Sequence, residues 1–299
     1  MSVRGCGPER ETRSDDENLL RDESWLALKD CEISLSIAAE PHESLRDEAE
    51  RILRLSETRG ITLRLLGGVA FGVRCPSASR PPLSRTYVDI DVIGHQKDSG
   101  KIKKLFDELG YKPRERFNVL QGTRLIFNDI KNSRRVDVFL DVFEMCHKFD
   151  FKKRMELDAT TLPLADLLST KLQIVEINEK DIKDILAMLL DHDLSGDGTK
   201  DTIDATYIAK LCAEDWGVYM TFTTNLGRVA DSAGRIGMNE EQRARVSDRA
   251  KKLTDLIEET PKTMGWRMRA AVGERRKWYE LPEPDREVVD SEATTGRRG

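Results

Sequence analysis

The segment RTYVDIDVIG, residues 85–94, has the β-branched and aromatic composition of a β-strand but contains two aspartates. Side chains alternate between the two faces of a strand, so Asp89 and Asp91 share one face and the intervening apolar residues share the other. Two adjacent carboxylates repel each other, and each loses hydration if it is buried. The segment therefore predicts either an edge strand with one solvated face or a cation held between the carboxylates, for which a hard divalent metal ion is the natural candidate.

The composition limits the classes of protein to consider. The chain has 299 residues, 38% of them hydrophobic and 34% charged, which suits one large or two ordinary globular domains. Its net charge of −5 argues against a protein that coats nucleic acid non-specifically. No apolar run approaches the ~20 residues of a membrane helix, and the N-terminus lacks the apolar core of a signal peptide. The scattered cysteines predict reduced thiols in a cytoplasmic protein: Cys6, Cys31, Cys75, Cys146 and Cys212.

Hydrophobic periodicity divides the chain into four predicted parts. They are a disordered leader (1–22), an α/β domain with a mixed sheet (23–156), an all-helical domain (157–280) and a disordered tail (281–299). In the α/β domain we predict helices and strands in the order helix 41–60, strand 61–66, strand 85–94, helix 97–110, two strands within 117–129 and strand 134–143. The fold class is therefore an α/β core followed by an all-helical C-terminal domain.

Two further features surround the aspartate-containing strand. Gly67 and Gly68 lie where the strand 61–66 turns into an apolar helical segment, and glycines there let backbone approach a phosphate at a helix N-terminus. A later strand carries Asp137 between two valines. If these two strands are neighbours, three carboxylates converge and could hold two metal ions ~3.5–4 Å apart, as in phosphoryl-transfer sites.

The order of these motifs resembles the nucleotidyltransferase superfamily with the DNA-polymerase-β-like fold. The matching pieces are LLGG (65–68), DID (89–91) and VDVF (136–139). The resemblance extends over about residues 60–195 and is nearest to the small bacterial nucleotidyltransferases that include abortive-infection (AbiEii-type) toxins. In that branch an Arg and a Thr precede the aspartate pair, and a helical domain supplies a Lys and an Asp. The matching residues here are Arg85, Thr86, Lys171, Asp181 and Asp184, whereas Val69 replaces a common Thr.

The resemblance implies a chemistry and a set of site residues. The implied reaction moves a nucleoside monophosphate from a nucleoside triphosphate to an acceptor hydroxyl. The implied cofactor is a pair of Mg²⁺ ions. Catalytic and metal-binding roles would fall to Asp89, Asp91 and Asp137. Nucleotide binding would fall to Gly67, Gly68, Arg85, Thr86, Lys171 and Asp184. The acceptor could be a tRNA, a protein or a small molecule. A non-catalytic nucleotide-binding module and a toxin with an antitoxin partner are the alternatives.

Lys171 also stands out without any family. In the predicted helix 160–177 it lies four residues from Leu167 and from Val175, on the apolar side. A lysine there needs an anion, which is a protein carboxylate or a nucleotide phosphate, unless its ammonium reaches solvent at the edge of the apolar stripe. The presence of Asp181 can also be explained without a site, because a carboxylate is favoured in the first turn of any helix.

Other candidates have alternative explanations. Asp141 shares a strand face with Asp137 and could replace it, but Asp137 is favoured because valines flank it and Asp141 lies near the expected end of the strand. Residues 191–202 imitate a calcium-binding loop but have Thr202 where a bidentate Glu belongs, which favours a polar loop between helices. Residues 265–282 mix cations with aromatic residues, a composition that suits nucleic acid but also a solvated helix surface.

Overall fold

The computed structural model describes residues 40–199 and 201–281, which belong to one compact unit. The predicted leader, nearly all of the predicted tail, Cys6 and Cys31 lie outside the described residues. The three cysteines inside them, Cys75, Cys146 and Cys212, are buried free thiols. Within the described ranges, no helix combines the length and the apolar character that crossing a membrane requires.

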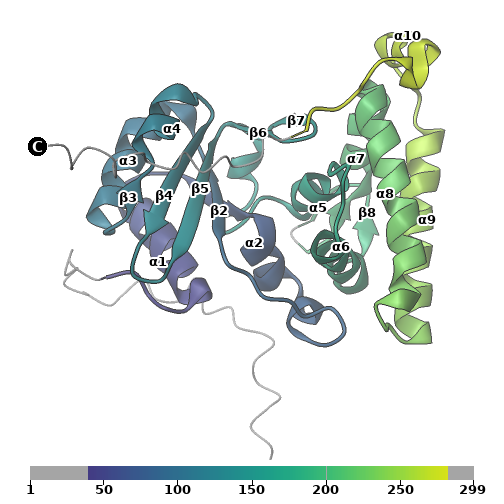
Figure 1. Ribbon diagram of the computed structural model, residues 1–299. Coiled ribbons are helices and arrows are strands. Elements are labelled where there is room, and N and C mark those ends of the chain that lie inside the picture. Colours follow the sequence, from purple (N-terminus) through teal and green to yellow (C-terminus); the bar gives the residue numbers. More distant parts are fainter. Residues whose placement is uncertain (1–39, 200, 282–299) are drawn as a thin grey trace, which may run out of the picture. The chain divides into compact units, whose positions relative to one another are not determined.

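A mixed β-sheet forms the core, as the sequence predicts (Figure 1). Strand β2 pairs with β1 antiparallel and with β5 parallel, and β4 runs antiparallel to both β5 and β3. A short continuation pairs β5 with β6 and β6 with β7. The strands are β1 (Leu63–Leu66), β2 (Ile90–Gly94), β3 (Lys112–Pro113), β4 (Arg124–Asp129), β5 (Arg134–Leu140), β6 (Val142–Glu144) and β7 (Lys148–Asp150).

Helices α1 (Leu45–Thr58) and α3 (Ser99–Glu108) belong to the core on one side of the sheet. Phe106 of α3 stacks on Phe127 of β4 with ring centroids 4.3 Å apart. Phe127 pairs with Val136, which pairs with Ile90, so these side chains all point to the same side. The alternate residues of β2 and β5, which include the aspartates, point to the opposite face.

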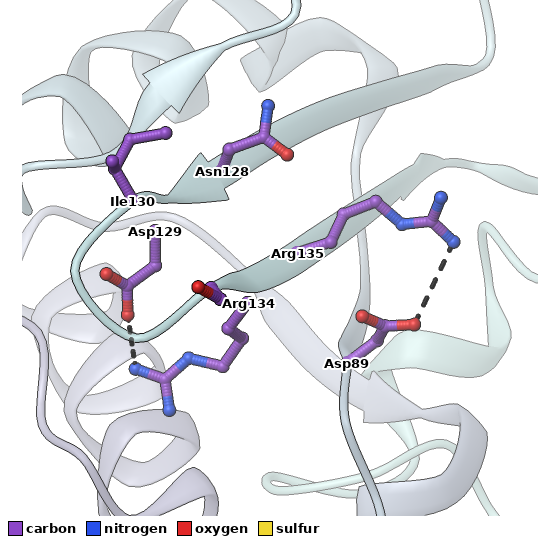
Figure 2. A pocket seen from close by; sticks show the side chains of 7 residues that line it. Asp89, Asn128, Asp129, Ile130, Arg134 and Arg135 are labelled. Carbon is purple, nitrogen blue, oxygen red and sulfur yellow. Dashed lines mark hydrogen bonds and ion pairs between the residues drawn. The ribbon is translucent and has the colours of Figure 1, made fainter. Parts of the chain in front are cut away.

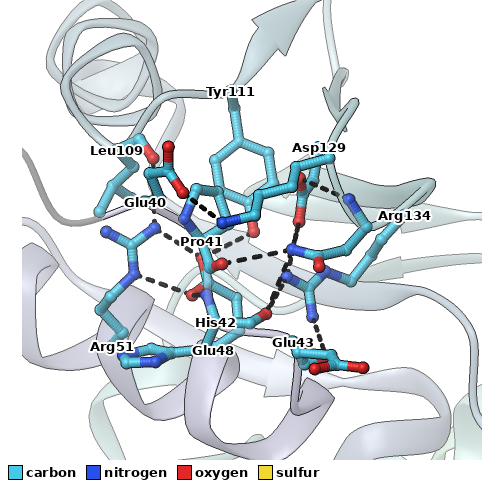
Figure 3. Close-up of polar contacts among 12 residues, drawn as sticks. Glu40, Pro41, His42, Glu43, Glu48, Arg51, Leu109, Tyr111, Asp129 and Arg134 are labelled. Atoms are coloured by element: carbon cyan, nitrogen blue, oxygen red, sulfur yellow. Dashed lines mark hydrogen bonds and ion pairs between the residues drawn. The ribbon is translucent and has the colours of Figure 1, made fainter.

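A buried polar network ties α1 to the sheet (Figure 3). Glu48 accepts hydrogen bonds from Arg51 and Tyr111, and Arg134 donates to Asp129 at 2.6 Å. Burial, followed by the charge of Glu48, raises the pKa of Tyr111 well above its usual value. Every charged member of this network has an opposite charge, which buried ionised groups require.

The remaining helices include α2, which follows β1 directly, and a helical part after residue 163 in which α5 and α6 pack against α2. These contacts cross the boundary predicted near residue 157. The helices are α2 (Gly67–Arg74), α4 (Glu115–Leu120), α5 (Leu164–Leu172), α6 (Glu179–Asp191), α7 (Ala205–Glu214), α8 (Trp216–Arg235), α9 (Glu240–Glu259) and α10 (Met264–Val272). Short elements are η2 (Pro76–Ser79), η3 (Gln96–Asp98), η4 (Arg154–Glu156), η5 (Gly273–Arg275), β8 (Leu194–Ser195) and β9 (Ile203–Asp204).

Three predictions of local structure are wrong. The first strand predicted within 117–129 is helix α4, in which Asn118 is held by two hydrogen bonds to the backbone of Ile126. Strand β2 begins only at Ile90, so Asp89 lies one residue before it. Helix α5 ends at Leu172, which leaves Val175 outside the helix that was predicted to contain it.

Candidate functional site

The sheet face opposite Ile90 and Val136 brings the predicted carboxylates Asp91 and Asp137 together. In the parallel register of β2 and β5, Asp91 lies directly beside Asp137. Neighbouring strands are ~4.8 Å apart, so the two side chains leave adjacent points on the same face. Asp137 is almost fully buried, with 1% of its surface exposed, whereas Asp89 lies at the rim with 37% of its side chain exposed.

The glycine turn is fitted to Asp91. Gly67 has φ = +65°, and a Cβ atom placed on it would lie 1.9 Å from Oδ2 of Asp91. A Cβ on Gly68 would lie 2.6 Å from the ring of Tyr87 and 2.7 Å from Nη2 of Arg85. Glycine is therefore required at both positions, because the backbone of the turn approaches an acidic and a basic side chain closely.

The electrostatics of the site disfavour ionised Asp91. Its pKa is raised to about 7, first by burial and then by the charge of Asp137, with Asp89 contributing in the same direction. Lys171 and Arg124 oppose this shift. At Asp91, burial and the neighbouring carboxylates therefore outweigh the positive charge of Lys171 and Arg124.

Two arginines contact the buried carboxylate. Nη2 of Arg124 lies 3.0 Å from Oδ2 of Asp137, and Nε of Arg135 lies 3.1 Å from the same oxygen. The guanidinium of Arg124 also lies 5.3 Å from the ring centroid of Phe139. Arg135 reaches further to Asp89, at 3.9 Å between Nη2 and Oδ2 (Figure 2).

A chain of alternating charges lies beside the glycine turn. Arg85 donates both Nε and Nη2 to Asp184, at 2.7 and 2.6 Å, and Lys171 contacts the same carboxylate at 3.0 Å. Lys171 also donates to Asp181 at 2.7 Å. Burial lowers the pKa of Lys171, but the two carboxylates outweigh it, so the pKa is raised and the ammonium stays charged. Thr86 is exposed, and its carbonyl accepts a hydrogen bond from Arg85.

The residues present fit a divalent cation by donor type and position. Asp89, Asp91 and Asp137 offer hard oxygen ligands on one face, and a bound cation would offset the burial and the carboxylate repulsion that raise the pKa of Asp91. Their side chains are not yet arranged as ligands: in the described ranges 40–199 and 201–281, no three such groups stand where they could share a metal ion. Asp137 fits the cation once its contacts with arginine are released.

The other sequence candidates lie elsewhere. Asp141 follows the end of β5 with φ = +58° and contacts His95 at 3.2 Å, so it does not share the site of Asp137. In the loop 191–202, Asp193 pairs with Arg249. Trp278 of the basic and aromatic segment packs against Trp216 of α8, with ring centroids 5.6 Å apart, so it is engaged within the protein.

Sequence reasoning missed Tyr87 and did not separate Arg135 from Arg134. The ring of Tyr87 lies against both Gly68 and Gly72, one helical turn apart in α2, and a pair of glycines with this spacing is a signal for such packing. Strand alternation places Arg135 on the face of Asp137 and Arg134 on the opposite face. That rule could have separated the two arginines from the sequence alone.

No protein-family model and no curated protein matches this chain. Among solved structures, the chain is similar to a solution structure of the antibiotic-resistance factor ANT(2'')-Ia. The similarity covers 62% of this chain and 92% of that chain, at 12% sequence identity and a TM-score of 0.34. A likeness of this size carries no argument about function, so the proposal below depends on the site itself.

Proposed function

We propose that this protein is a metal-dependent nucleotidyltransferase, which moves a nucleoside monophosphate from a nucleoside triphosphate to an acceptor hydroxyl and releases pyrophosphate. The observation that carries the proposal is the fit of Gly67 against Asp91, with Asp137 in register on the next strand. This arrangement joins a glycine turn at a helix N-terminus, with Arg85 against it, to a group of carboxylates on one sheet face.

The triphosphate would lie along the N-terminal end of α2. Backbone N–H groups at Gly67 and Gly68 would face the β and γ phosphates, because glycine leaves no side chain in the way. Arg85 lies against Gly68 of α2. Nζ of Lys171, in α5, lies 5.8 Å from the ring centroid of Phe71, which is also in α2. Both cations would counter the phosphate charge, and Asp184 would orient them, since it contacts both.

Asp89 and Asp91 would hold Mg²⁺, and Asp137 would complete the site. The bound ions would supply positive charge to the reacting phosphate and its leaving group. In the role we propose for Asp137, one carboxylate oxygen accepts the proton of the attacking hydroxyl. Its burial excludes water and keeps the group close to the reacting atoms. Most of the rate enhancement would come from positioning and charge neutralisation.

One observation favours the alternative of a nucleotide-binding module without transfer activity. Arg124 and Arg135 both contact Asp137, and a carboxylate permanently neutralised in this way would be a poor base. The two functions differ in outcome, because the module would bind a nucleoside triphosphate and transfer nothing. A toxin role with an antitoxin partner, and a tRNA, protein or small-molecule acceptor, follow from the resemblance and stay predictions.

The test is incubation of the protein with each α-labelled nucleoside triphosphate, Mg²⁺ and a cell extract, followed by separation of RNA, protein and small molecules. We expect label in one fraction and none when Asp137→Asn replaces the parent. Asp141→Asn is the matched control, because it removes an aspartate four residues away that lies outside the site. Triphosphate binding without label in any fraction would support the binding module instead.

A further inference from the structure

The space between two proposed metal ligands is spanned by an arginine. Arg135 places Nε 3.1 Å from Asp137 and Nη2 3.9 Å from Asp89, so one guanidinium contacts carboxylates from two neighbouring strands (Figure 2). A divalent ion shared by these carboxylates would use the same oxygens. The guanidinium and the ion cannot occupy that position together, since they compete for the oxygens and repel each other.

The position of Arg135 follows from the strand register. It lies two residues before Asp137 on β5, hence on the same face, and the pairing of Ile90 with Val136 places it beside Asp89. The guanidinium of Arg135 therefore occupies the position between Asp89 and Asp137. Arg124 contacts Asp137 as well but comes from β4 and lies near the ring of Phe139.

Arg135 has room to leave the carboxylates. Its side chain is 29% exposed and lines a cavity of about 480 Å³ together with Asn128, Ile130 and Ser133. Figure 2 shows Asn128 and Ile130 on the side of Arg135 opposite β2. An amide, a hydroxyl and solvent in this cavity can replace the ion-pair contacts that the guanidinium would give up.

We propose that Arg135 competes with the divalent cation for Asp89 and Asp137, so that metal binding and release of the arginine are one equilibrium. The inference rests on the proposed function, because it concerns the metal site of that function. In the metal-free protein the guanidinium neutralises Asp137 and blocks it as a base. Binding of the cation displaces the guanidinium of Arg135 into the cavity, while Arg124 stays on Asp137, so that Arg135 sets how much metal the enzyme needs.

The test measures metal binding itself, with no nucleotide and no turnover. Free Mn²⁺ is followed by electron paramagnetic resonance during titration of the parent, Arg135→Gln and Arg135→Lys. Lys112→Gln is the control. Lys112 is exposed, and it pairs with Asn128, which pairs with Arg135, so Lys112 lies on the same sheet face as Arg135 but two strands away. Melting temperatures measured alongside confirm that each variant is folded.

Arg135→Gln should bind Mn²⁺ about tenfold more tightly than the parent, since it removes a charged hydrogen-bonding competitor. Lys112→Gln should change the affinity less than about twofold, because exposed charges at that distance are screened. Arg135→Lys should fall between the parent and Arg135→Gln, as a lysine keeps the charge but cannot contact both carboxylates in the same way.

Other outcomes overturn the inference and separate it from the proposed function. If Arg135→Gln and the parent bind Mn²⁺ equally, Arg135 does not compete with the cation, whereas the proposed metal-dependent function is unaffected. Weaker binding by Arg135→Gln would show that the arginine supports the metal site instead. If neither protein binds Mn²⁺, the inference fails together with the metal dependence of the proposed function.

Discussion

Replacement of Asp91 by asparagine should make the metal-free protein more stable at neutral pH. Asp91 lies beside Asp137 in a half-buried position, and its pKa is raised from 3.8 to about 7, mainly by burial and then by that neighbour. Ionisation of Asp91 therefore costs folding free energy that an asparagine does not lose. Asp91, which we propose as a metal ligand, is thus expected to destabilise the fold when no cation is bound.

The size of the effect follows from the shift in pKa. A change from 3.8 to about 7 corresponds to about 4 kcal/mol of folding free energy, at 1.36 kcal/mol for each pKa unit. The asparagine amide must still find hydrogen-bond partners beside Gly67, which reduces the gain to about 2 kcal/mol. For a domain of this size, that is roughly a 4–8 °C rise in melting temperature.

The sign with pH is fixed by the same shift. Because the folded protein holds the Asp91 proton more tightly than the unfolded chain, the parent loses stability as the pH rises from about 4 through about 7. Asp91→Asn has no carboxyl group to ionise at this position, so it does not lose stability in this way. The variant should therefore be about 2 kcal/mol less stable than the parent at pH 4, where only the hydrogen-bond cost remains, and about 2 kcal/mol more stable at pH 8.

The assay is thermal and urea unfolding at both pH values in EDTA, repeated with Mg²⁺. Asp107→Asn is the control, because it removes an exposed aspartate and should change stability by less than about 0.5 kcal/mol. Mg²⁺ should stabilise the parent and close the gap to Asp91→Asn. A variant no more stable than the parent at pH 8 in EDTA would refute the argument from burial and repulsion.

Three further outcomes are expected. Asp137→Asn should abolish label transfer at least ~10³-fold but leave Mg²⁺-dependent triphosphate binding measurable by calorimetry, whereas Asp141→Asn should keep most of the transfer activity. Lys171→Met should lower the free energy of unfolding, measured in urea, by about 3 kcal/mol. It removes the ammonium that contacts Asp181 and Asp184, of which Asp184 keeps its contact with Arg85. An unchanged unfolding midpoint would contradict these ion-pair contacts. Gly67→Ala should weaken triphosphate binding and lower the melting temperature, since the added Cβ would meet Asp91 at 1.9 Å and force a left-handed backbone on alanine; wild-type binding would show that the turn can shift.

Periodicity identified most elements that bury an apolar face. Helix α3 lies within its predicted segment, and strand β5 begins where predicted but ends three residues early, at Leu140. These elements were predictable because a buried stripe or alternating face repeats at the period of the local structure. Helix α4 was not predictable, because it leaves Val119 and Leu120 more than 80% exposed, and the side chain of Asn118 holds it to Ile126 across the sheet.

The site shows a similar division. The aspartates and the glycine pair could be chosen from the sequence as site candidates. A carboxylate in an apolar strand and a pair of glycines in an apolar turn both cost folding free energy unless another interaction compensates. The sequence favoured Asp137 over Asp141, and the tertiary structure supplies the backbone geometry that separates them. Strand β5 ends at Leu140 and Asp141 takes a left-handed backbone, so alternation does not extend to it.

What the sequence determined by itself is the local chemistry: which residues are too polar or too flexible for their surroundings, and which face of a strand or helix they share. What only the tertiary structure decided is the partner of each charge. Lys171 could have faced a phosphate or a carboxylate, and it contacts Asp181 and Asp184, brought within reach by the next helix. Arg135 and Asp89 are far apart in the chain and meet because β2 and β5 pair in parallel. Charge pairing depends on distances of a few ångströms between separate elements, and a linear pattern does not contain those distances.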